Sequence, residues 1–265
     1  MWQKPAYLGR QFGDVFQDAS VAAAYRFRAP YPPETFAILA GLLADEPPRA
    51  VLDVGAGRGD IARALLPYAD RVDALDPSPA MIARGRALPG GDDPCLRWIE
   101  GYAEDASLDP PYALITAAQS LHWMEWAIVL PRFASALTPS GSLAVLTTVD
   151  RPRPWDEAQT QIIKRYSLNR SYRPYDMIAH LDEHGLFARI GEARTTPVPF
   201  AQTADDYIEA FHAMSSFSRE RMPPEDAAAF DADVRALVTP YASEDGLLRW
   251  DVSALITWGR PLGTM

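Results

Sequence analysis

The chain has 265 residues, 48% of them hydrophobic, and its formal net charge at pH 7 is −10. This negative balance argues against a nucleic-acid partner, because such affinity comes mainly from basic contacts to phosphate. The chain holds a single cysteine, Cys95, which excludes an internal disulfide, and its histidines look too scattered for a metal site. These histidines are His122, His180, His184 and His212.

Two negative observations concern membranes and export. No segment approaches the roughly 20 consecutive apolar residues that a membrane helix needs. The first five residues, Met-Trp-Gln-Lys-Pro, do not begin an apolar signal-peptide core. We therefore expect a cytoplasmic protein, a monomer or homodimer, whose partner is a small molecule rather than a membrane or a nucleic acid.

The first 45 residues are expected to form a helical cap over a ligand cleft. Apolar residues around 15–25 predict a helix, and three prolines in 30–33 predict an extended lead-in. The apolar spacing of 34–43 predicts a second helix with one buried face.

Residues 50–62 carry the most informative pattern in the chain. They read Ala-Val-Leu-Asp-Val-Gly-Ala-Gly-Arg-Gly-Asp-Ile-Ala, which predicts an apolar strand, a glycine-rich turn and the start of a helix. A dinucleotide-binding turn requires Gly-x-Gly-x-x-Gly, but Asp60 stands at the last of these positions and would repel a pyrophosphate. A phosphate-binding loop is also excluded, since no Gly-Lys-Ser or Gly-Lys-Thr occurs in the chain. The pattern favours a nucleoside ligand without phosphate.

Residues 52–59, with Asp53 two positions before the first glycine, resemble motif I of the class I methyltransferases that depend on S-adenosylmethionine (SAM). The resemblance implies that Asp53, Gly55, Ala56 and Gly57 bind SAM. It also implies an α/β fold: a Rossmann-like sheet of seven strands in the order 3-2-1-4-5-7-6, strand 7 antiparallel, with helices on both faces.

The second strand, expected at 71–76, ends in the acid Asp76. Its two carboxylate oxygens suit the two hydroxyls of a ribose, and it follows Asp53 at the spacing usual for a ribose acid. The competing interpretation is a carboxylate that stabilises the start of the helix expected from residue 80. With Asp76 in the ribose role, Pro77 and Met81 are expected to flank the adenine.

A third strand is expected at 96–101, followed by Ala103 and Glu104. By resemblance, Glu104 accepts from the adenine amino group while a main-chain amide at Ala103 contacts the ring. Two exposed loop acids, Glu104 and Asp105, are the alternative interpretation.

Residues 109–112 read Asp-Pro-Pro-Tyr, the tetrapeptide with which amino-methyltransferases hold a target nitrogen. In those enzymes it follows the fourth strand. Here it precedes the strand expected at 112–118, so we interpret it as a turn at the sheet edge away from the cofactor.

The segment after that fourth strand contains Gln119, His122 and Trp123. It resembles the same region of the trans-aconitate methyltransferase-like branch, as does the Tyr25 to Pro32 lead-in. We expect Gln119 to contact SAM and Trp123 to contact the acceptor. His122 is a candidate base if the acceptor is a hydroxyl, a positioning residue if it is a carboxylate, or simply a packed residue.

The remaining elements are less regular. Helices are expected at 126–137, 156–166, 177–184, 204–214 and 224–238, a turn at 138–141, and strands at 142–149, 186–200 and 247–258. Candidate acceptor contacts are Tyr25, Arg28, Tyr172, Arg173 and Phe211, with the arginines suited to a carboxylate.

Taken together, we expect one methyltransferase domain over residues 1–265. Residues 1–45 would form the cap, 46–150 the SAM-binding core, and 151–265 the rest of the sheet with helical inserts that build the acceptor pocket. The expected reaction moves a methyl group from SAM to an oxygen of a small molecule, leaving S-adenosylhomocysteine. The alternatives are a SAM-binding enzyme that catalyses a rearrangement or cyclisation, a nicotinamide oxidoreductase and a SAM-binding regulator.

Overall fold

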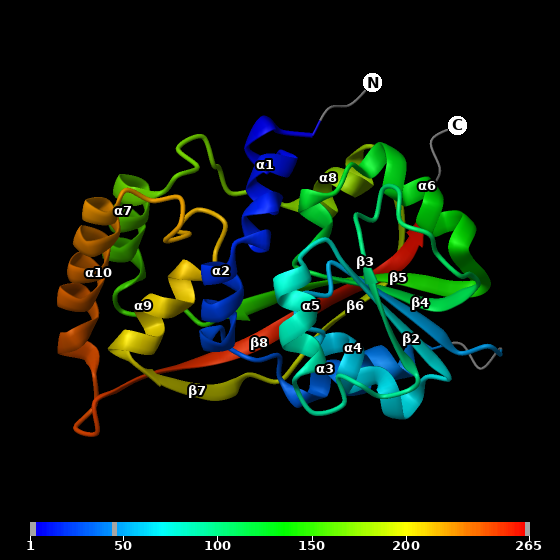
Figure 1. Cartoon of the computed structure of the whole chain (residues 1–265), viewed down its shortest axis with the longest axis horizontal. Helices are drawn as coiled ribbons and strands as arrows, with labels where there is room; N and C mark the ends of the chain where they lie inside the picture. The colour runs from blue at the N-terminus through cyan, green and yellow to red at the C-terminus, as the bar shows by residue number, and fades with distance from the viewer. Residues whose placement is uncertain (1–3, 44–46, 263–265) are drawn as a thin grey trace.

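A twisted β-sheet runs through the middle of the molecule and helices cover both of its faces (Figure 1). In this computed structural model, residues 4–43 and 47–262 are described. The sheet has eight strands in the order β3-β2-β1-β4-β5-β8-β6, and β7 also pairs with β8. The strands are β1 (Ala50–Val54), β2 (Arg71–Asp76), β3 (Leu96–Glu100), β4 (Tyr112–Ala118), β5 (Leu137–Asp150), β6 (Phe187–Arg194), β7 (Val198–Thr203) and β8 (Leu247–Pro261).

The first five strands are parallel, which places their carboxyl ends at one edge of the sheet. Strand β1 pairs with β2 on one side and β4 on the other, so Asp53 lies beside Ala74 and Thr116. Strand β5 pairs with β4 in parallel and with β8 in antiparallel orientation. The predicted fold class is thus confirmed, with β8 as the antiparallel strand between β5 and β6.

Two apolar layers account for the helices on the two faces. One buried cluster joins helix α6 (Trp126–Ala136) and helix α8 (Met177–Glu183) to Leu52, Ile115 and Leu143 of the sheet. The other joins α3 (Pro33–Gly41), α4 (Asp60–Leu65) and α5 (Pro79–Arg86) to the opposite face. Side chains of a strand alternate between its faces, so each central strand supplies both layers.

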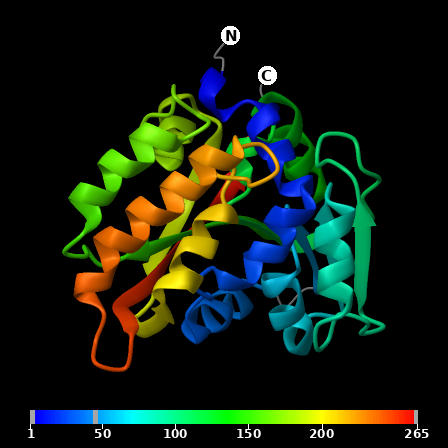
Figure 2. The ribbon, with the colours of Figure 1, turned by 60° about the vertical axis from the view of Figure 1, so that its left-hand side comes forward.

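A third apolar cluster lies beyond the sheet and forms the cap over β7 and the start of β8 (Figure 2). It joins α7 (Asp156–Tyr166), α9 (Ala204–His212) and α10 (Pro224–Val238), with Phe230 fully buried among them. Strand β8 connects the two parts: its first half pairs with β7 and its second half with β5 and β6.

The N-terminal segment lies between the cap and the core. It comprises η1 (Ala6–Leu8), α1 (Arg10–Gly13), η2 (Asp14–Gln17), α2 (Ala19–Ala24) and η3 (Tyr25–Phe27). In Figure 1, α2 lies between α9 and α5, and it contacts both. Gln17 donates to the Tyr102 hydroxyl at 2.8 Å, and Arg221 donates two hydrogen bonds to the Asp18 carboxylate. The middle of the segment is therefore hydrogen-bonded to the core on one side and to the chain before α10 on the other.

Three sequence expectations about these elements are wrong. The single strand expected at 186–200 is two strands, β6 and β7. Residues 195–197, which end in Pro197, separate them, and β7 then pairs with the first half of β8. The turn expected at 138–141 lies within β5, as a bulge between the pairs Tyr112–Leu137 and Leu114–Ser142. Residues 25–27 form a 3-10 helix rather than an extended lead-in.

The remaining short 3-10 helices are η4 (Leu66–Tyr68), η5 (Leu121–Trp123) and η6 (Thr239–Tyr241). Residues 1–3, 44 and 45 of the expected cap and residue 46 of the expected core lie outside the described residues. Among the helices that the structure describes, none has the length and apolarity to cross a membrane.

Candidate active site

The glycine-rich turn after β1 forms one wall of the site. Gly55 and Gly57 have φ values of 64° and 56°, in the left-handed region that favours glycine. A Cβ atom on Gly55 would lie 2.4 Å from the Cβ of Ser120, whose hydroxyl donates to the Val54 carbonyl at 2.6 Å. The sequence places glycine here because the loop after β4 packs directly against the turn.

The carboxylate of Asp76, at the end of β2, faces this turn. One oxygen accepts from the Gly57 amide at 2.7 Å and the other from the Ser78 amide at 2.8 Å. The side chain is buried, and burial raises its pKa to about 6 although both amide hydrogen bonds favour the charged form. Ser78 also caps α5, since its hydroxyl accepts from the Met81 amide. The position of Asp76 is therefore compatible with both interpretations, a ribose contact and a carboxylate at the start of the helix.

Asp53 is the second buried acid of the site. Its Oδ1 accepts from the Thr116 hydroxyl of β4 at 2.8 Å, and its Oδ2 is buried with no hydrogen-bond partner among the described atoms. Burial raises its pKa to about 7, which is well above the ordinary range of an aspartate. This carboxyl group is therefore poised to change its charge near neutral pH.

A cavity of about 790 Å³, open to solvent, lies over the turn and Asp76. It brings together eight of the predicted cofactor residues: Gly55, Gly57, Asp76, Pro77, Met81, Ala103, Glu104 and Gln119. The predicted acceptor residues Tyr25, Arg28 and Trp123 also line it. We call this the first cavity.

The first cavity also has walls that sequence reasoning missed. Arg10, Asp14 and Phe16 line it from the N-terminal segment, and Tyr102 lines it from the loop after β3. The Arg10 guanidinium lies 3.5 Å above the Tyr102 ring, and the Tyr102 hydroxyl donates to Asp14 at 2.9 Å. These residues belong to short irregular helices whose sequence carries no motif.

A second, larger cavity of about 1830 Å³ adjoins the first. It holds the predicted residues Asp53, Ala56 and Phe211, which do not line the first cavity. Its far wall is the cap: Arg153, Tyr207 and Trp250 line it together with Met214. The Arg153 guanidinium lies within 6 Å of three aromatic rings, those of Trp155, Tyr207 and Trp250.

The two cavities share five lining residues, which mark where they meet. These are Tyr25, Arg28, Gly55, Ala118 and Gln119. The Arg28 guanidinium donates to Gln119 Oε1 at 2.8 Å, and Gln119 Nε2 donates to the Thr148 hydroxyl of β5. Gln119 itself has a φ of 55°, a conformation uncommon for a residue other than glycine and characteristic of functional sites.

The structure places His122 behind the site rather than in it. His122 lines neither of the two cavities formed by the described residues, and its ring packs 4.3 Å from that of Trp123. Burial lowers its pKa to about 4, with Lys4 and Arg28 contributing in the same direction. This placement favours the packed interpretation over the base.

Two predicted acceptor residues are not brought to the site. Tyr172 is 52% exposed and its ring contacts the edge of Tyr7, and Arg173 is exposed and donates to the Tyr172 carbonyl. Neither lines the two cavities of the described chain. The structure thus leaves these two predicted acceptor residues on the surface after α7 and does not bring them to the cavities.

The Asp-Pro-Pro-Tyr sequence lies at the amino end of β4, away from both cavities. Its Asp109 accepts from Arg71 at the start of β2, and the Tyr112 hydroxyl donates to the buried Asp73 at 2.6 Å. The tetrapeptide is a structural turn, as its position in the sequence predicts.

The expectation that the histidines are scattered needs one correction. His180 and His184 lie one helical turn apart at the end of α8, next to Glu183. The spacing of three and four residues was visible in the sequence, but its meaning depends on a helix ending there.

Residues 51–141 match the family model of the methyltransferase domain. An uncharacterized methyltransferase of Mycobacterium tuberculosis (strain ATCC 25618 / H37Rv) is 34% identical over 149 residues, which cover 56% of this chain and 58% of that protein. The match thus spans less than two thirds of that relative.

Two further matches are also to proteins described as methyltransferases. The trans-aconitate 2-methyltransferase of Methylobacterium nodulans is 35% identical over 113 residues, or 40% of this chain and 42% of that protein. A structure from Anaeromyxobacter dehalogenans, of a protein predicted to be a type II methyltransferase, shares the fold with a TM-score of 0.57 at 23% identity, covering 89% of this chain and 99% of that one. The family model thus identifies a methyltransferase domain at residues 51–141, and the relatives and the shared fold agree with it.

Proposed function

We propose that the protein transfers the methyl group of SAM to an oxygen of a small-molecule acceptor, most simply a carboxylate. The observation that carries the proposal is the meeting of two cavities at Tyr25, Arg28, Gly55, Ala118 and Gln119. Transfer between two bound molecules requires two adjacent sites with one common opening, and alignment at that opening is the main contribution of such an enzyme.

The residues of the first cavity fit SAM. Asp76 faces the turn with a carboxylate that suits two ribose hydroxyls, while Glu104 and the main chain at Ala103 lie where the adenine edge would be recognised. Three acids, Asp14, Asp76 and Glu104, line this cavity with two arginines, Arg10 and Arg28, so the lining lacks the excess of positive charge that a phosphorylated nucleotide favours. The bare main chain of Gly55 and Gly57 leaves room for the amino acid end of SAM.

The second cavity suits an acceptor that is partly anionic and partly apolar. Arg28 stands at the opening and has donors beyond the one it gives to Gln119, so it can hold a carboxylate near the first cavity. The cap supplies aromatic and aliphatic surface from Tyr207, Phe211 and Trp250 for the rest of the acceptor. We therefore place the acceptor oxygen beside Arg28 and its apolar body toward the cap.

A carboxylate acceptor needs no general base at the site. SAM, when bound, supplies an electrophilic methyl group, and a carboxylate can accept it without first losing a proton. His122, the base considered from the sequence, lies outside the cavities and has a lowered pKa. Arg28 and Gln119 orient the acceptor, while Tyr25 and Trp123 keep water away from the opening.

One relative supports the same acceptor class. The Methylobacterium nodulans protein is a trans-aconitate 2-methyltransferase, and its similarity covers 40% of this chain. We infer that the present protein shares a preference for acid acceptors, and that the larger second cavity admits acids with a bulkier body.

The test is formation of S-adenosylhomocysteine from SAM in the presence of a panel of carboxylic acids, alcohols and amines. We expect turnover with one or more acids, and a loss of turnover in Arg28→Met that appears mainly as a raised KM for the acid. The matched control is Arg26→Met, since Arg26 is exposed two residues away and lines neither described cavity.

Three outcomes contradict parts of this proposal. Turnover with amines or alcohols alone refutes the carboxylate. An acid that is converted while SAM remains intact replaces methyl transfer with a rearrangement. An unchanged KM in Arg28→Met moves the acceptor away from the opening.

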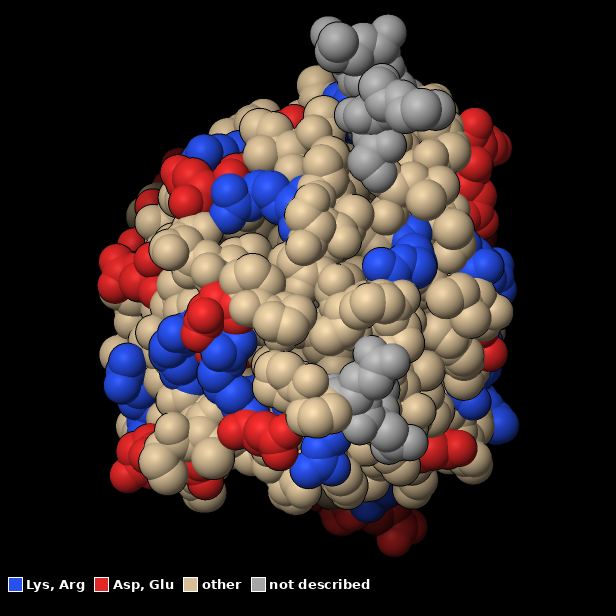
Figure 3. Space-filling view, turned by 90° about the vertical axis from the view of Figure 1, so that its right-hand side faces the viewer, with Lys and Arg blue, Asp and Glu red and all other residues tan. Residues whose placement is uncertain are grey.

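We also propose that the enzyme acts in the cytoplasm as a monomer or homodimer, without a nucleic-acid partner. The exposed thiol of Cys95 suits a reducing compartment. Acidic and basic side chains are interspersed on the face shown in Figure 3, which supports a surface without affinity for a polyanion.

A further inference from the structure

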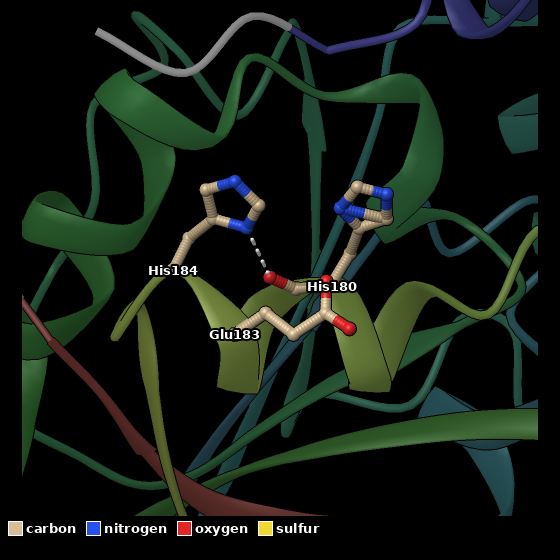
Figure 4. Close-up of side chains that lie close together, drawn as sticks. All are labelled: His180, Glu183 and His184. Atoms are coloured by element: carbon tan, nitrogen blue, oxygen red, sulfur yellow. Dashed lines mark hydrogen bonds between the residues drawn. The ribbon is translucent and has the colours of Figure 1, made fainter.

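Three side chains with metal-ligating atoms lie together at the end of α8, outside the two cavities. They are His180, Glu183 and His184, and one ligand atom from each lies within 4.8 Å of the other two (Figure 4). Helix α8 ends at Glu183 and His184 follows it as the capping residue. Residues three and four positions apart share one face of a helix, so the helix itself brings these groups together.

The hydrogen bonding of His184 fixes which nitrogen can bind a metal. Its Nδ1 lies 2.8 Å from the main-chain carbonyl of His180, shown as the dashed line in Figure 4. A carbonyl oxygen only accepts, so Nδ1 carries the proton and, in the neutral ring, Nε2 carries the lone pair. A carbonyl partner on one ring nitrogen is the usual arrangement around a histidine that binds metal through the other.

The rings are also held in place. His180 stacks on Tyr175 with ring centroids 4.8 Å apart, and His184 stacks on His180 at 5.3 Å with an angle of 18° between the planes. Glu183 and His184 are exposed, whereas His180 is half-buried. A tetrahedral zinc site has ligand atoms roughly 3.3 Å apart, so binding an ion requires these side chains to move closer than the 4.8 Å within which they lie.

We propose that His180, Glu183 and His184 form a binding site for one divalent transition metal ion of the Zn²⁺ type, with water completing the coordination. Two imidazoles and one carboxylate are a ligand set that suits Zn²⁺ and disfavours Mg²⁺ and Ca²⁺, which prefer oxygen ligands alone. The proposal does not depend on the function proposed above.

The role we assign to the site is binding and local stabilisation rather than catalysis. The spacing His-x-x-Glu-His also occurs in a class of zinc peptidases, where the residues face a substrate cleft. Here none of the three residues lines either cavity formed by the described residues. A bound ion would instead hold the end of α8 where the chain turns into β6, and would hold His180 against Tyr175.

The test measures Zn²⁺ binding to the full chain without an affinity tag, by titration calorimetry and by competition with a chromogenic chelator. We expect one equivalent per chain, and affinities in His184→Ala and Glu183→Gln that fall by about tenfold or more. The matched control is Asp182→Asn, an exposed acid on the same helix outside the trio, which we expect to leave the affinity unchanged.

Three further measurements keep the result interpretable. Both key substitutions are at exposed positions, so circular dichroism should show an unchanged fold. The exposed thiol of Cys95 is another zinc ligand on the surface, and Cys95→Ser should therefore retain the bound equivalent. Thermal unfolding of the unmodified chain should shift upward with Zn²⁺, because a ligand that binds only the native state stabilises it.

Either of two results overturns the proposal. One is an absence of stoichiometric binding to the unmodified chain at micromolar Zn²⁺. The other is binding that persists with equal affinity in His184→Ala and Glu183→Gln, or that disappears in Cys95→Ser. Activity with SAM enters none of these measurements, so failure here leaves the proposed function standing.

Discussion

At the scale of single residues, Asp76 has both carboxylate oxygens bound by main-chain amides before any ligand arrives. Gly57 donates to one oxygen at 2.7 Å and Ser78 to the other at 2.8 Å. Each carboxylate oxygen can accept a second hydrogen bond, so the amides orient the group and leave it able to accept from a ligand. The turn and the acid are therefore one unit, which a change at either partner disturbs.

We expect Asp76→Asn to weaken SAM binding by about 10- to 100-fold, since a hydrogen bond to a charged group contributes about 1.5–3 kcal/mol. Titration calorimetry measures the change directly. The control is Asp109→Asn, in the Asp-Pro-Pro-Tyr turn at the other edge of the sheet. Equal losses in both variants would mean that the affinity reflects general stability rather than the ribose contact.

Asp53 provides a prediction about pH. Burial raises its pKa to about 7 in the folded chain, against 3.8 for an ordinary aspartate carboxyl group. The native state therefore binds more protons than the unfolded state between these values, so this group adds stability as the pH falls from 8 to 5.

We expect Asp53→Asn to remove that contribution. The difference in unfolding free energy between pH 8 and pH 5 should become smaller by about 2–3 kcal/mol, as a pKa shift of this size implies. Urea unfolding at both pH values measures it. A pH dependence identical to that of the unmodified chain would show that Asp53 ionises normally.

At the scale of elements, the N-terminal segment decides whether the first cavity is closed. It supplies Arg10, Asp14 and Phe16 to the wall, and Asp18 anchors it to the linker before α10 through Ser218 and Arg221. Short helices of three to six residues are not stable alone, so these contacts hold them. A change that removes these contacts should therefore loosen the wall of the first cavity.

We expect Asp18→Ala to loosen this segment. Amide hydrogen exchange over residues 14–24 should become faster, and the SAM dissociation constant should rise, because the wall of the first cavity is then less ordered. The control is Asp205→Ala, which removes an exposed ion pair with Arg235 between α9 and α10. If exchange is unchanged by Asp18→Ala, the anchor lies elsewhere along the segment.

At the scale of the whole molecule, both cavities lie between independently packed parts. The first cavity lies between the sheet and the N-terminal segment, and the second between the sheet and the cap of α7, α9 and α10. A ligand that bridges such parts stabilises all of them together.

We therefore expect SAM to raise the thermal midpoint of unfolding, whereas NAD should leave it nearly unchanged. At 100 times the dissociation constant the gain is about 2.7 kcal/mol, which corresponds to roughly 5–10 °C for a chain of this size. Differential scanning fluorimetry compares the two ligands, with Asp76→Asn as the control that should respond less to SAM. A larger shift with NAD would contradict the ligand assigned from the spacing of the glycines.

Strands β1 to β4 and helices α3 to α7 could be predicted closely from the sequence because each is a local pattern. An apolar run ends near a charged residue or a glycine, and a helix begins a few residues later, as after Asp53, Gly55 and Asp76. Such patterns need only neighbouring residues to be read. The order of the parallel strands followed from the family that these residues resemble.

Other features depended on contacts between distant residues. The split of the sixth strand into β6 and β7 reflects the length of β8, which pairs with both. The positions of Tyr172, Arg173 and His122 depended on which way a loop turns, and the Arg10 and Asp14 wall depended on short helices held by Tyr102 and Arg221. None of these choices leaves a periodic signal in the sequence.

The sequence by itself determined the class of sheet, the turn that suits SAM and the acid that faces it, because strand, glycine turn and helix start are encoded within a few residues. Only the tertiary structure decided that two cavities meet at Arg28 and Gln119, and that His180 and His184 lie beside Glu183. The reason is physical: a cavity is bounded by segments far apart in the chain, and its shape follows from how apolar layers pack.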